Sequence, residues 1–285
     1  MPAEPPIEIP EHLSEAYALL AAAPHVPIAG GTDIMVRITG EIGPVPDRML
    51  DLSRLADLEG ISLERGVLVL GARTTYTEIR RSALCREHLP ALVEAAATIG
   101  AAQIQNRGTL GGNIANASPA GDTLPVLLAL DADIVLGSHA GERVVPAGDF
   151  FPSYRATALR GNELILRVRI PLVPGREARF RKVGGRRAQA ISKVVMAVAW
   201  RDHGATAGWS DVRVALGSVA ATPIRAAGAE AVLEGARPSP EVADAAAEAL
   251  AAELHPIDDV RSTATYRRTV AARILHRIVR DAGGW

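Results

Sequence analysis

The chain has 285 residues, 48% of them hydrophobic, and its 31 Lys and Arg against 32 Asp and Glu leave a net charge of −1. This balance excludes a strongly basic nucleic-acid binder and a polyacidic disordered tail, so we expect no nucleic-acid partner. At roughly 100–200 residues per domain, the length suggests two domains with enough apolar side chains for a sizeable core.

Cysteine content and hydropathy narrow the class of protein further. The single cysteine, Cys85, excludes an internal disulfide framework, and it excludes an iron–sulfur cluster or a cysteine-rich zinc site on this chain, so we expect no metal site. Met1 to Pro6 has neither the basic nor the apolar region of a secretory signal. No apolar run approaches the roughly 18 residues of a membrane helix. These features predict a cytoplasmic protein without membrane insertion.

Hydrophobic periodicity predicts the elements of the longer first part. The apolar positions of residues 13–20 share one helix face, and Pro24 ends that helix. In residues 164–170 the even-numbered positions are apolar and Arg167 and Arg169 stand between them, which is typical of a half-buried strand. In chain order, the pattern predicts a helix over 11–23, a strand over 26–29, a helix over 34–39, strands over 49–52 and 67–70, helices over 75–84 and 90–101, and strands over 134–136, 144–145 and 164–170.

Pro171 to Gly175 breaks all periodicity, and we place the domain boundary there, giving domains over 1–174 and 175–285. The smaller part combines apolar strands separated by Gly and Asp turns with two closing helices, so it predicts a small antiparallel sheet covered by helices. Its predicted strands are 179–183, 193–200 and 212–219, and its predicted helices are 240–254 and 263–279. The fold class expected for the whole chain is α+β.

A first glycine segment, Ile28-Ala29-Gly30-Gly31-Thr32-Asp33, joins an apolar strand to a predicted helix. Adjacent glycines allow positive φ and close approach of a ligand, and free amides before a helix favour an anion such as a phosphate. The same pattern also suits a tight strand-to-helix turn without a ligand, so both interpretations stay open.

A second glycine segment covers residues 98–122. It contains Thr98-Ile99-Gly100 and then a stretch from Asn106 to Asp122 in which small and hydrogen-bonding residues predominate. We expect a long loop that wraps around a ligand, with amides and neutral side chains around a pyrophosphate and Asp122 free to accept from a ribose hydroxyl or an adenine amine. A structured loop that merely caps strands is the alternative. The residues of interest are Thr109, Leu110, Gly111, Gly112, Asn113 and Ser118.

Other chemistry finds little support. The chain contains neither the Gly-x-Gly-x-x-Gly pattern of Rossmann folds nor the Gly-Lys-Ser/Thr of a P-loop. Its seven histidines are scattered without metal-ligand spacing, and no Gly-x-Ser-x-Gly elbow is present. Cys85 lies on a predicted helix and is better explained as a core residue. We therefore expect no catalytic side chain on this chain.

With these segments in view, the chain resembles the FAD-binding (medium) subunits of the molybdenum hydroxylases, the family of xanthine dehydrogenase and aerobic carbon monoxide dehydrogenase. The resemblance covers essentially the whole chain. It rests on four motifs in order: Ala29–Asp33; Thr109–Asn113 with Ser118-Pro119 and Asp122; Phe150–Arg155 with Glu163–Ile165 and Ile170-Pro171; and Phe180–Lys182 with Arg186-Arg187, Ile191 and Lys193-Val194.

The resemblance implies a VAO/PCMH-type FAD-binding domain of two α/β subdomains, followed by a C-terminal domain with an antiparallel sheet and helices. It implies that both glycine segments hold the FAD pyrophosphate, that Asp122 binds the adenosine side, and that Ile99, Ile165 and Lys182 also touch the cofactor. It places Tyr154 and Gln189–Ile191 near the isoalloxazine. FAD joins one-electron iron–sulfur carriers to a two-electron acceptor. Because one cysteine cannot hold an iron–sulfur cluster, the resemblance implies partner subunits. These are a small subunit with 2Fe-2S clusters and a large subunit with the molybdopterin cofactor.

Two departures from the family pattern matter. Thr32 stands where many related oxidases place a histidine that tethers the flavin, so we predict non-covalent FAD. Gln189 stands where some NAD-reducing relatives carry an acid, which leaves open whether NAD or another molecule is the acceptor.

The predicted function is electron transfer from iron–sulfur clusters to that acceptor, during oxidation of xanthine-like or other heterocycles or aldehydes. The alternatives are a carbon monoxide dehydrogenase subunit, a non-catalytic FAD-binding module, and a stand-alone oxidase, which lacks a candidate base.

Overall fold

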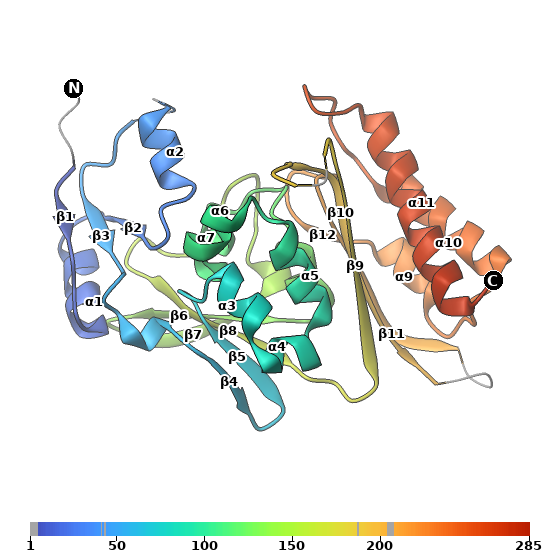
Figure 1. The fold of residues 1–285 in the computed structure, drawn as a ribbon, viewed down its shortest axis with the longest axis horizontal. Helices are drawn as coiled ribbons and strands as arrows, with labels where there is room; N and C mark the ends of the chain where they lie inside the picture. Colours follow the sequence, from blue (N-terminus) through green and yellow to red (C-terminus); the bar gives the residue numbers. More distant parts are fainter. Residues whose placement is uncertain (1–4, 41, 43, 187, 204–207) are drawn as a thin grey trace.

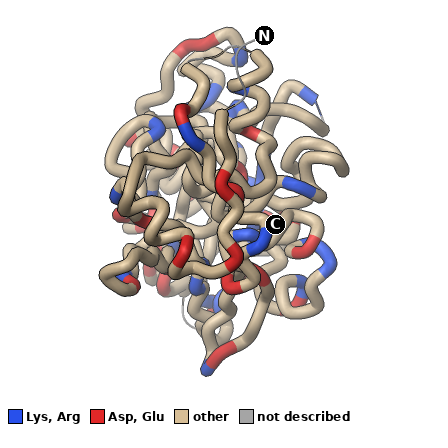
Figure 2. Tube along the Cα trace, turned by 90° about the vertical axis from the view of Figure 1, so that its left-hand side faces the viewer, with Lys and Arg blue, Asp and Glu red and all other residues tan. Residues whose placement is uncertain are grey.

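The computed structural model describes residues 5–40, 42, 44–186, 188–203 and 208–285. Met1 to Glu4, on which part of the signal-peptide expectation rests, and Arg187 therefore lie outside the described residues. Three sheets follow one another across the molecule, from the blue N-terminal part to the red C-terminal part (Figure 1). Acidic and basic residues are interspersed over the chain (Figure 2), which agrees with the near-zero net charge.

The first sheet is small and parallel, with strand order β1-β3-β2. Parallel strands need a crossover, and α1 provides one between β1 and β2 while burying Ala16 and Leu20 against Leu50. The helix α2 follows the first glycine segment and buries none of its residues. The bounds are β1 Ile7–Glu8, α1 Leu13–Ala22, β2 Val26–Ile28, α2 Ile34–Thr39, β3 Met49–Asp51 and the 3-10 turn η1 Ala56–Leu58.

The second sheet is antiparallel throughout, with strand order β4-β5-β8-β6-β7. Short helices cover one of its faces, and α5 and α8 also contact the third sheet, so one large core joins the two (Figure 1). The bounds are β4 Ile61–Glu64, β5 Val67–Gly71, α3 Tyr76–Arg81, α4 Ala83–His88, α5 Pro90–Thr98, α6 Ala102–Arg107, α7 Leu110–Asn116, α8 Leu124–Ala129, β6 Asp133–Ser138, β7 Gly141–Pro146, the 3-10 turn η2 Ala147–Asp149 and β8 Leu164–Pro171.

The simple alternation predicted for β8 is wrong over part of its length. Its pairing with β6 shifts register, so that Leu136 faces Ile165 while Val135 faces Arg167, which leaves Leu166 as an extra residue. Such a bulge reverses the side on which later side chains lie. Ile165 consequently shares the large core with Val168, whereas Leu166 packs toward α1.

The C-terminal sheet is antiparallel, as expected, with strand order β12-β11-β10-β9. Its central strand β10 is buried on both faces: Val195 and Ala197 belong to the large core, while Met196 and Val198 pack against the last helices. This two-sided burial explains the nearly continuous apolar run. The bounds are β9 Arg176–Gly184, β10 Ser192–Asp202, β11 Trp209–Gly217, β12 Ile224–Arg225, α9 Ala227–Leu233, α10 Pro240–Glu253 and α11 Ala264–Gly283.

An ionic cluster links the second sheet region to the third. Asp131, just after α8, accepts hydrogen bonds from Arg176 at 3.0 Å, Arg213 at 3.1 Å and Arg225 at 3.4 Å. The Arg176 side chain is only 7% exposed, and Asp211 also pairs with it. A buried guanidinium needs such partners, so the cluster connects the two regions through charge as well as through apolar packing.

The helix predicted over 75–84 is in fact two helices, because Ser82 adopts an extended conformation and its side chain caps α4. Cys85 is buried on α4, which agrees with its interpretation as a core residue, and burial raises its pKa. Among the described residues, no helix is both long enough and apolar enough to cross a bilayer.

Candidate functional site

The two glycine segments meet in space. A Cβ placed on Gly30 would lie 1.8 Å from the carbonyl oxygen of Arg107, so the main chain of the first segment touches that of the second. A Cβ on Gly108 would in turn lie 3.3 Å from the Thr32 hydroxyl oxygen. Side chains at these glycines would force the segments apart, so the sequence needs glycine here to close the contact.

The first segment offers main-chain donors. Gly31 has φ +72°, which turns the chain sharply between β2 and α2. Among the hydrogen bonds of the described residues, none uses the N–H groups of Gly31, Thr32 or Asp33. Successive free N–H groups in such a turn form a concave site that suits an anion.

The second segment is not the long loop expected from its composition. Residues 102–107 and 110–116 form α6 and α7, and the Thr109 hydroxyl caps α7 by accepting from the Gly112 N–H at 3.1 Å. Composition misled because glycine lowers helix propensity, whereas here capping and burial of Leu110 and Ile114 hold the turn.

Adjacent glycines on α7 have different roles. Gly111 is buried, and a Cβ there would come within 2.7 Å of both the Cβ and the carbonyl oxygen of Ala72. Gly112 is exposed to the cleft, and a Cβ there would meet only the Thr109 hydroxyl oxygen, at 2.9 Å. Gly111 therefore serves helix–strand packing, while Gly112 leaves space for a ligand.

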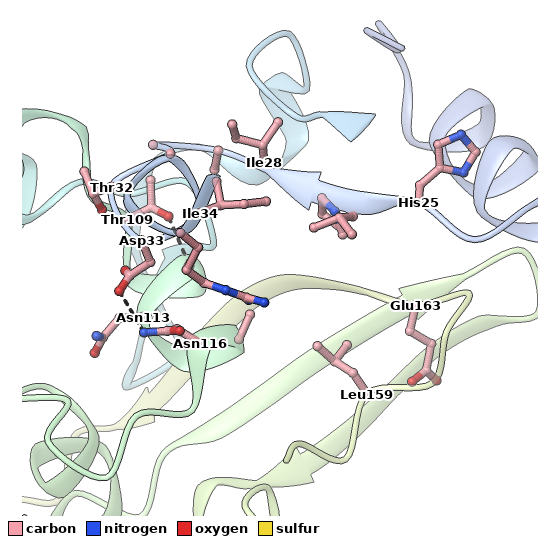
Figure 3. A pocket seen from close by; sticks show the side chains of 18 of the residues that line it. His25, Ile28, Thr32, Asp33, Ile34, Thr109, Asn113, Asn116, Leu159 and Glu163 are labelled. Carbon is pink, nitrogen blue, oxygen red and sulfur yellow. Dashed lines mark hydrogen bonds between the residues drawn. The ribbon is translucent and has the colours of Figure 1, made fainter. Parts of the chain in front are cut away.

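A cleft of about 420 Å³ opens beside this junction. In Figure 3, Thr32, Asp33, Thr109, Asn113 and Asn116 gather at one end, and His25 and Glu163 lie at the other. A smaller hollow of about 90 Å³ adjoins it, lined by Gly111, Gly112 and Ile165 among others. Of the predicted site residues, the larger cleft is lined by Ile28, Ala29, Gly30, Gly31, Thr32, Asp33, Thr109, Gly112 and Asn113.

A series of side-chain hydrogen bonds runs along the edge of the cleft. Asn116 donates from Nδ2 to the Asp33 carboxylate at 2.8 Å (Figure 3), and Arg155 donates to Asn116 Oδ1 at 3.2 Å. Burial raises the pKa of Asp33, and the Arg155 charge opposes that rise. The Phe-Phe-Pro-Ser-Tyr-Arg motif, whose two phenylalanines are buried in the core, thus reaches the first segment through its exposed Arg155.

Asp122 is not free, contrary to the expectation from the sequence. Lys182 on β9 donates to Asp122 Oδ2 at 2.5 Å and to the Thr98 carbonyl at 3.0 Å. Burial raises the pKa of Asp122 to about 6, against the opposing effect of the Lys182 charge. The other carboxylate oxygen, Oδ1, is buried without a hydrogen-bond partner, so this oxygen can still accept from a ligand.

Comparison with known proteins decides the family. Residues 4–173 match the family model described as the FAD binding domain in molybdopterin dehydrogenase, and residues 179–282 match the CO dehydrogenase flavoprotein C-terminal domain. The chain belongs to the FAD-binding medium subunits of the molybdenum hydroxylases. This medium subunit is therefore part of an oxidoreductase, and the VAO/PCMH-type α+β fold expected from the resemblance is confirmed.

Relatives align along nearly the full length. The medium subunit is 32% identical to the carbon monoxide dehydrogenase medium chain of Hydrogenophaga pseudoflava (96% of this chain, 95% of the relative). It is also 32% identical to the xanthine dehydrogenase FAD-binding subunit of Escherichia coli O157:H7 (95% of each). The solved carbon monoxide dehydrogenase of Hydrogenophaga pseudoflava superposes with a TM-score of 0.92 at 32% identity (97% and 96% covered). Quinoline 2-oxidoreductase of Pseudomonas putida 86 gives a TM-score of 0.92 at 28% identity (99% and 98% covered).

The residues of the medium subunit fit a flavin dinucleotide. Free N–H groups on the first segment suit a pyrophosphate, the bare Gly112 leaves room for its approach, and the unpaired Asp122 Oδ1 suits a hydroxyl or amine donor. The predicted residues outside the larger cleft are Ile99, Leu110, Gly111, Ser118, Asp122, Ile165 and Lys182. Of these, Leu110 is fully buried and packs α7 onto the large core.

Sequence reasoning missed several residues of the cleft. Tyr76, His25, Arg37, Leu159 and Glu163 line it, although only Glu163 stood in a noted motif. The sequence carries no signal for them because they come from four separate parts of the chain, with Leu159 and Glu163 both in the segment before β8, and only the fold brings these parts together. Gln189, assigned by resemblance to the flavin region, is exposed with φ +51°, and its carbonyl accepts from Arg186.

Proposed function

We propose that this medium subunit binds FAD non-covalently where its two glycine segments meet, and that it transfers electrons within a molybdenum hydroxylase complex. The observation that carries the proposal is the contact of Gly30 with the Arg107 main chain beside a 420 Å³ cleft lined by both segments. In this proposal Ile28–Asp33, Thr109, Gly112, Asn113 and Ser118 surround the pyrophosphate, while the buried Leu110 and Gly111 hold α7 in place behind them. Asp122, Lys182, Ile99 and Ile165 contact the rest of the cofactor.

Non-covalent binding is supported by the state of the nucleophiles near the cleft. His25 lines it, but Nδ1 lies 2.8 Å from the Ala23 carbonyl oxygen and Nε2 is bonded to the Glu8 carboxylate. Both ring nitrogens are thus engaged. Cys85 is buried on α4, outside the residues that line the cleft. Thr32 is a poor nucleophile without a neighbouring base.

Bound FAD would supply the exchange between one-electron carriers and a two-electron acceptor. One cysteine cannot hold an iron–sulfur cluster, so the electron donor lies on another chain. We therefore propose a complex with a small 2Fe-2S subunit and a large molybdopterin subunit, in which NAD or another molecule is the final acceptor. A cytoplasmic location and the division at residue 174 remain predictions from the sequence.

The substrate is proposed at the level of a class. Relatives of equal identity are named for carbon monoxide and for xanthine, so similarity along this chain does not separate the two. We propose a xanthine-like or other heterocycle or aldehyde, with carbon monoxide as the alternative. The molybdenum subunit would make that choice, since this chain carries no candidate catalytic side chain for it.

The test begins with the purified chain and then uses the complex. We expect one FAD per chain, released into the supernatant by acid precipitation, because no covalent bond holds it. In the complex, substrate should bleach the flavin absorbance and the acceptor should restore it. Flavin that stays in the acid pellet would contradict non-covalent binding. A flavin that substrate never reduces in the full complex would favour a non-catalytic FAD-binding module.

A further inference from the structure

Tyr76 occupies the junction of the two glycine segments. It is the first residue of α3 and only 4% exposed, and its N–H donates to the Gly108 carbonyl at 3.2 Å. A Cβ on Gly108 would lie 2.7 Å from the Tyr76 ring, so ring and main chain are in direct contact. The same Gly108 adjoins the Thr32 hydroxyl, which places the tyrosine beside the first segment as well.

Among the described residues, no side chain or main-chain group is hydrogen-bonded to the Tyr76 hydroxyl, and the side chain lines the cleft. Buried tyrosine hydroxyls usually find a partner, because burying an unpaired polar group costs free energy. Tyr76 as a whole residue is only 4% exposed, and its hydroxyl lies at the cleft wall as a donor without a protein acceptor.

The electrostatic environment of Tyr76 keeps its phenol protonated. Burial raises the pKa of Tyr76 above its usual range, and the carboxylates of Asp33 and Asp122 raise it further. Both carboxylates already accept other hydrogen bonds, from Asn116 and from Lys182. Tyr76 thus presents a neutral O–H at neutral pH in the same cleft that the first segment lines.

We propose that Tyr76 is a further cofactor-binding residue, whose hydroxyl donates a hydrogen bond to a phosphate oxygen of FAD. The inference rests on the proposed FAD site. A phosphate oxygen is favoured over a hydroxyl because the junction gathers donors and needs an acceptor. A neutral donor also stabilises the anion without adding a buried charge.

The test compares Tyr76→Phe with the wild-type chain, using Tyr17→Phe as the matched control. Tyr17 is a partly buried tyrosine on α1 that lies outside the residues lining the cleft. After removal of bound flavin, titration with FAD and with ADP-ribose should give on the order of tenfold to hundredfold weaker binding for Tyr76→Phe alone. In the FAD-loaded protein, phosphorus NMR should show a shift of a pyrophosphate resonance in that variant only.

Unchanged FAD affinity in Tyr76→Phe would overturn the inference, as would a loss of affinity with both pyrophosphate resonances unmoved. An equal loss in Tyr17→Phe would also overturn it, because the effect would then not depend on the junction. If the wild-type chain binds neither FAD nor ADP-ribose, the proposed function itself fails. The two failures are therefore distinguishable.

Discussion

Gly30 lies directly against the carbonyl group of Arg107, 77 positions further along the chain, with no room for a Cβ between them. Gly30 lies within the turn between β2 and α2 of the first sheet region, and Arg107 is the last residue of α6, one of the short helices that cover the second sheet. The contact therefore joins two subdomains through main-chain atoms alone. It places free N–H groups from one subdomain beside the helical turn of the other, at the edge of the cleft.

Replacing Gly30 by Ala should separate the two segments, since the new Cβ would lie 1.8 Å from the Arg107 carbonyl oxygen. We expect a loss of about 1–3 kcal/mol in unfolding free energy and FAD binding at least tenfold weaker. Chemical denaturation and flavin titration measure the two effects. Gly148→Ala is the control, because a Cβ at Gly148 meets nothing within 4 Å. Wild-type FAD affinity in Gly30→Ala would contradict the site.

Substitutions at Gly112 and Gly111 should separate an effect on FAD binding from an effect on folding stability. Gly112→Val points a side chain into the cleft and meets only the Thr109 hydroxyl oxygen, so FAD binding should be abolished while the melting temperature falls less than in Gly111→Val. Gly111→Val meets Ala72 in the core, so unfolding free energy should fall by about 1–3 kcal/mol or more. Flavin content and melting temperature of both variants check this. Normal flavin content in Gly112→Val would remove the assigned role of α7 in binding.

The raised pKa of Asp122, about 6, predicts a pH dependence of the flavin-free chain. The native state holds this proton more tightly than the unfolded state, whose aspartates titrate near about 3.9. Its contribution to stability is thus fully present below pH 4 and is lost as pH rises through about 6. The unfolding free energy of wild type minus that of Asp122→Asn should fall over this window. A flat difference between pH 4 and 7 would contradict the shift.

Asp131 should couple the second and third sheets through its three arginine partners. It has φ +50°, so Asp131→Asn removes the charge while keeping a residue that tolerates this conformation. We expect a loss of about 1–3 kcal/mol, because Arg176 stays buried with a weakened partner. Differential scanning calorimetry measures it. Asp281→Asn, an exposed substitution on α11, should leave the melting temperature unchanged.

Sequence patterns were reliable where an element has a regular apolar face or a continuous apolar run. The helix α1, which buries Ala16 and Leu20, follows from periodicity, and the strand β10, buried on both faces, follows from its apolar run. They failed where a local backbone feature intervened. The bulge at Leu166 reverses the faces of β8, and the extended Ser82 divides a helix in two. Neither feature has a strong composition signal, since each depends on how the neighbouring strand or helix packs.

The amino-acid sequence by itself determined that two glycine-rich segments could take a dinucleotide, and that one cysteine leaves iron–sulfur chemistry to another chain. Only the tertiary structure decided that the second segment is helical at Leu110–Asn116, that Asp122 is paired with Lys182, and that the Tyr76 hydroxyl lies at the cleft without a protein partner. The physical reason is that glycine and asparagine spacing reports where a backbone can turn or approach a ligand. Which groups face one another depends on contacts between residues far apart in the chain.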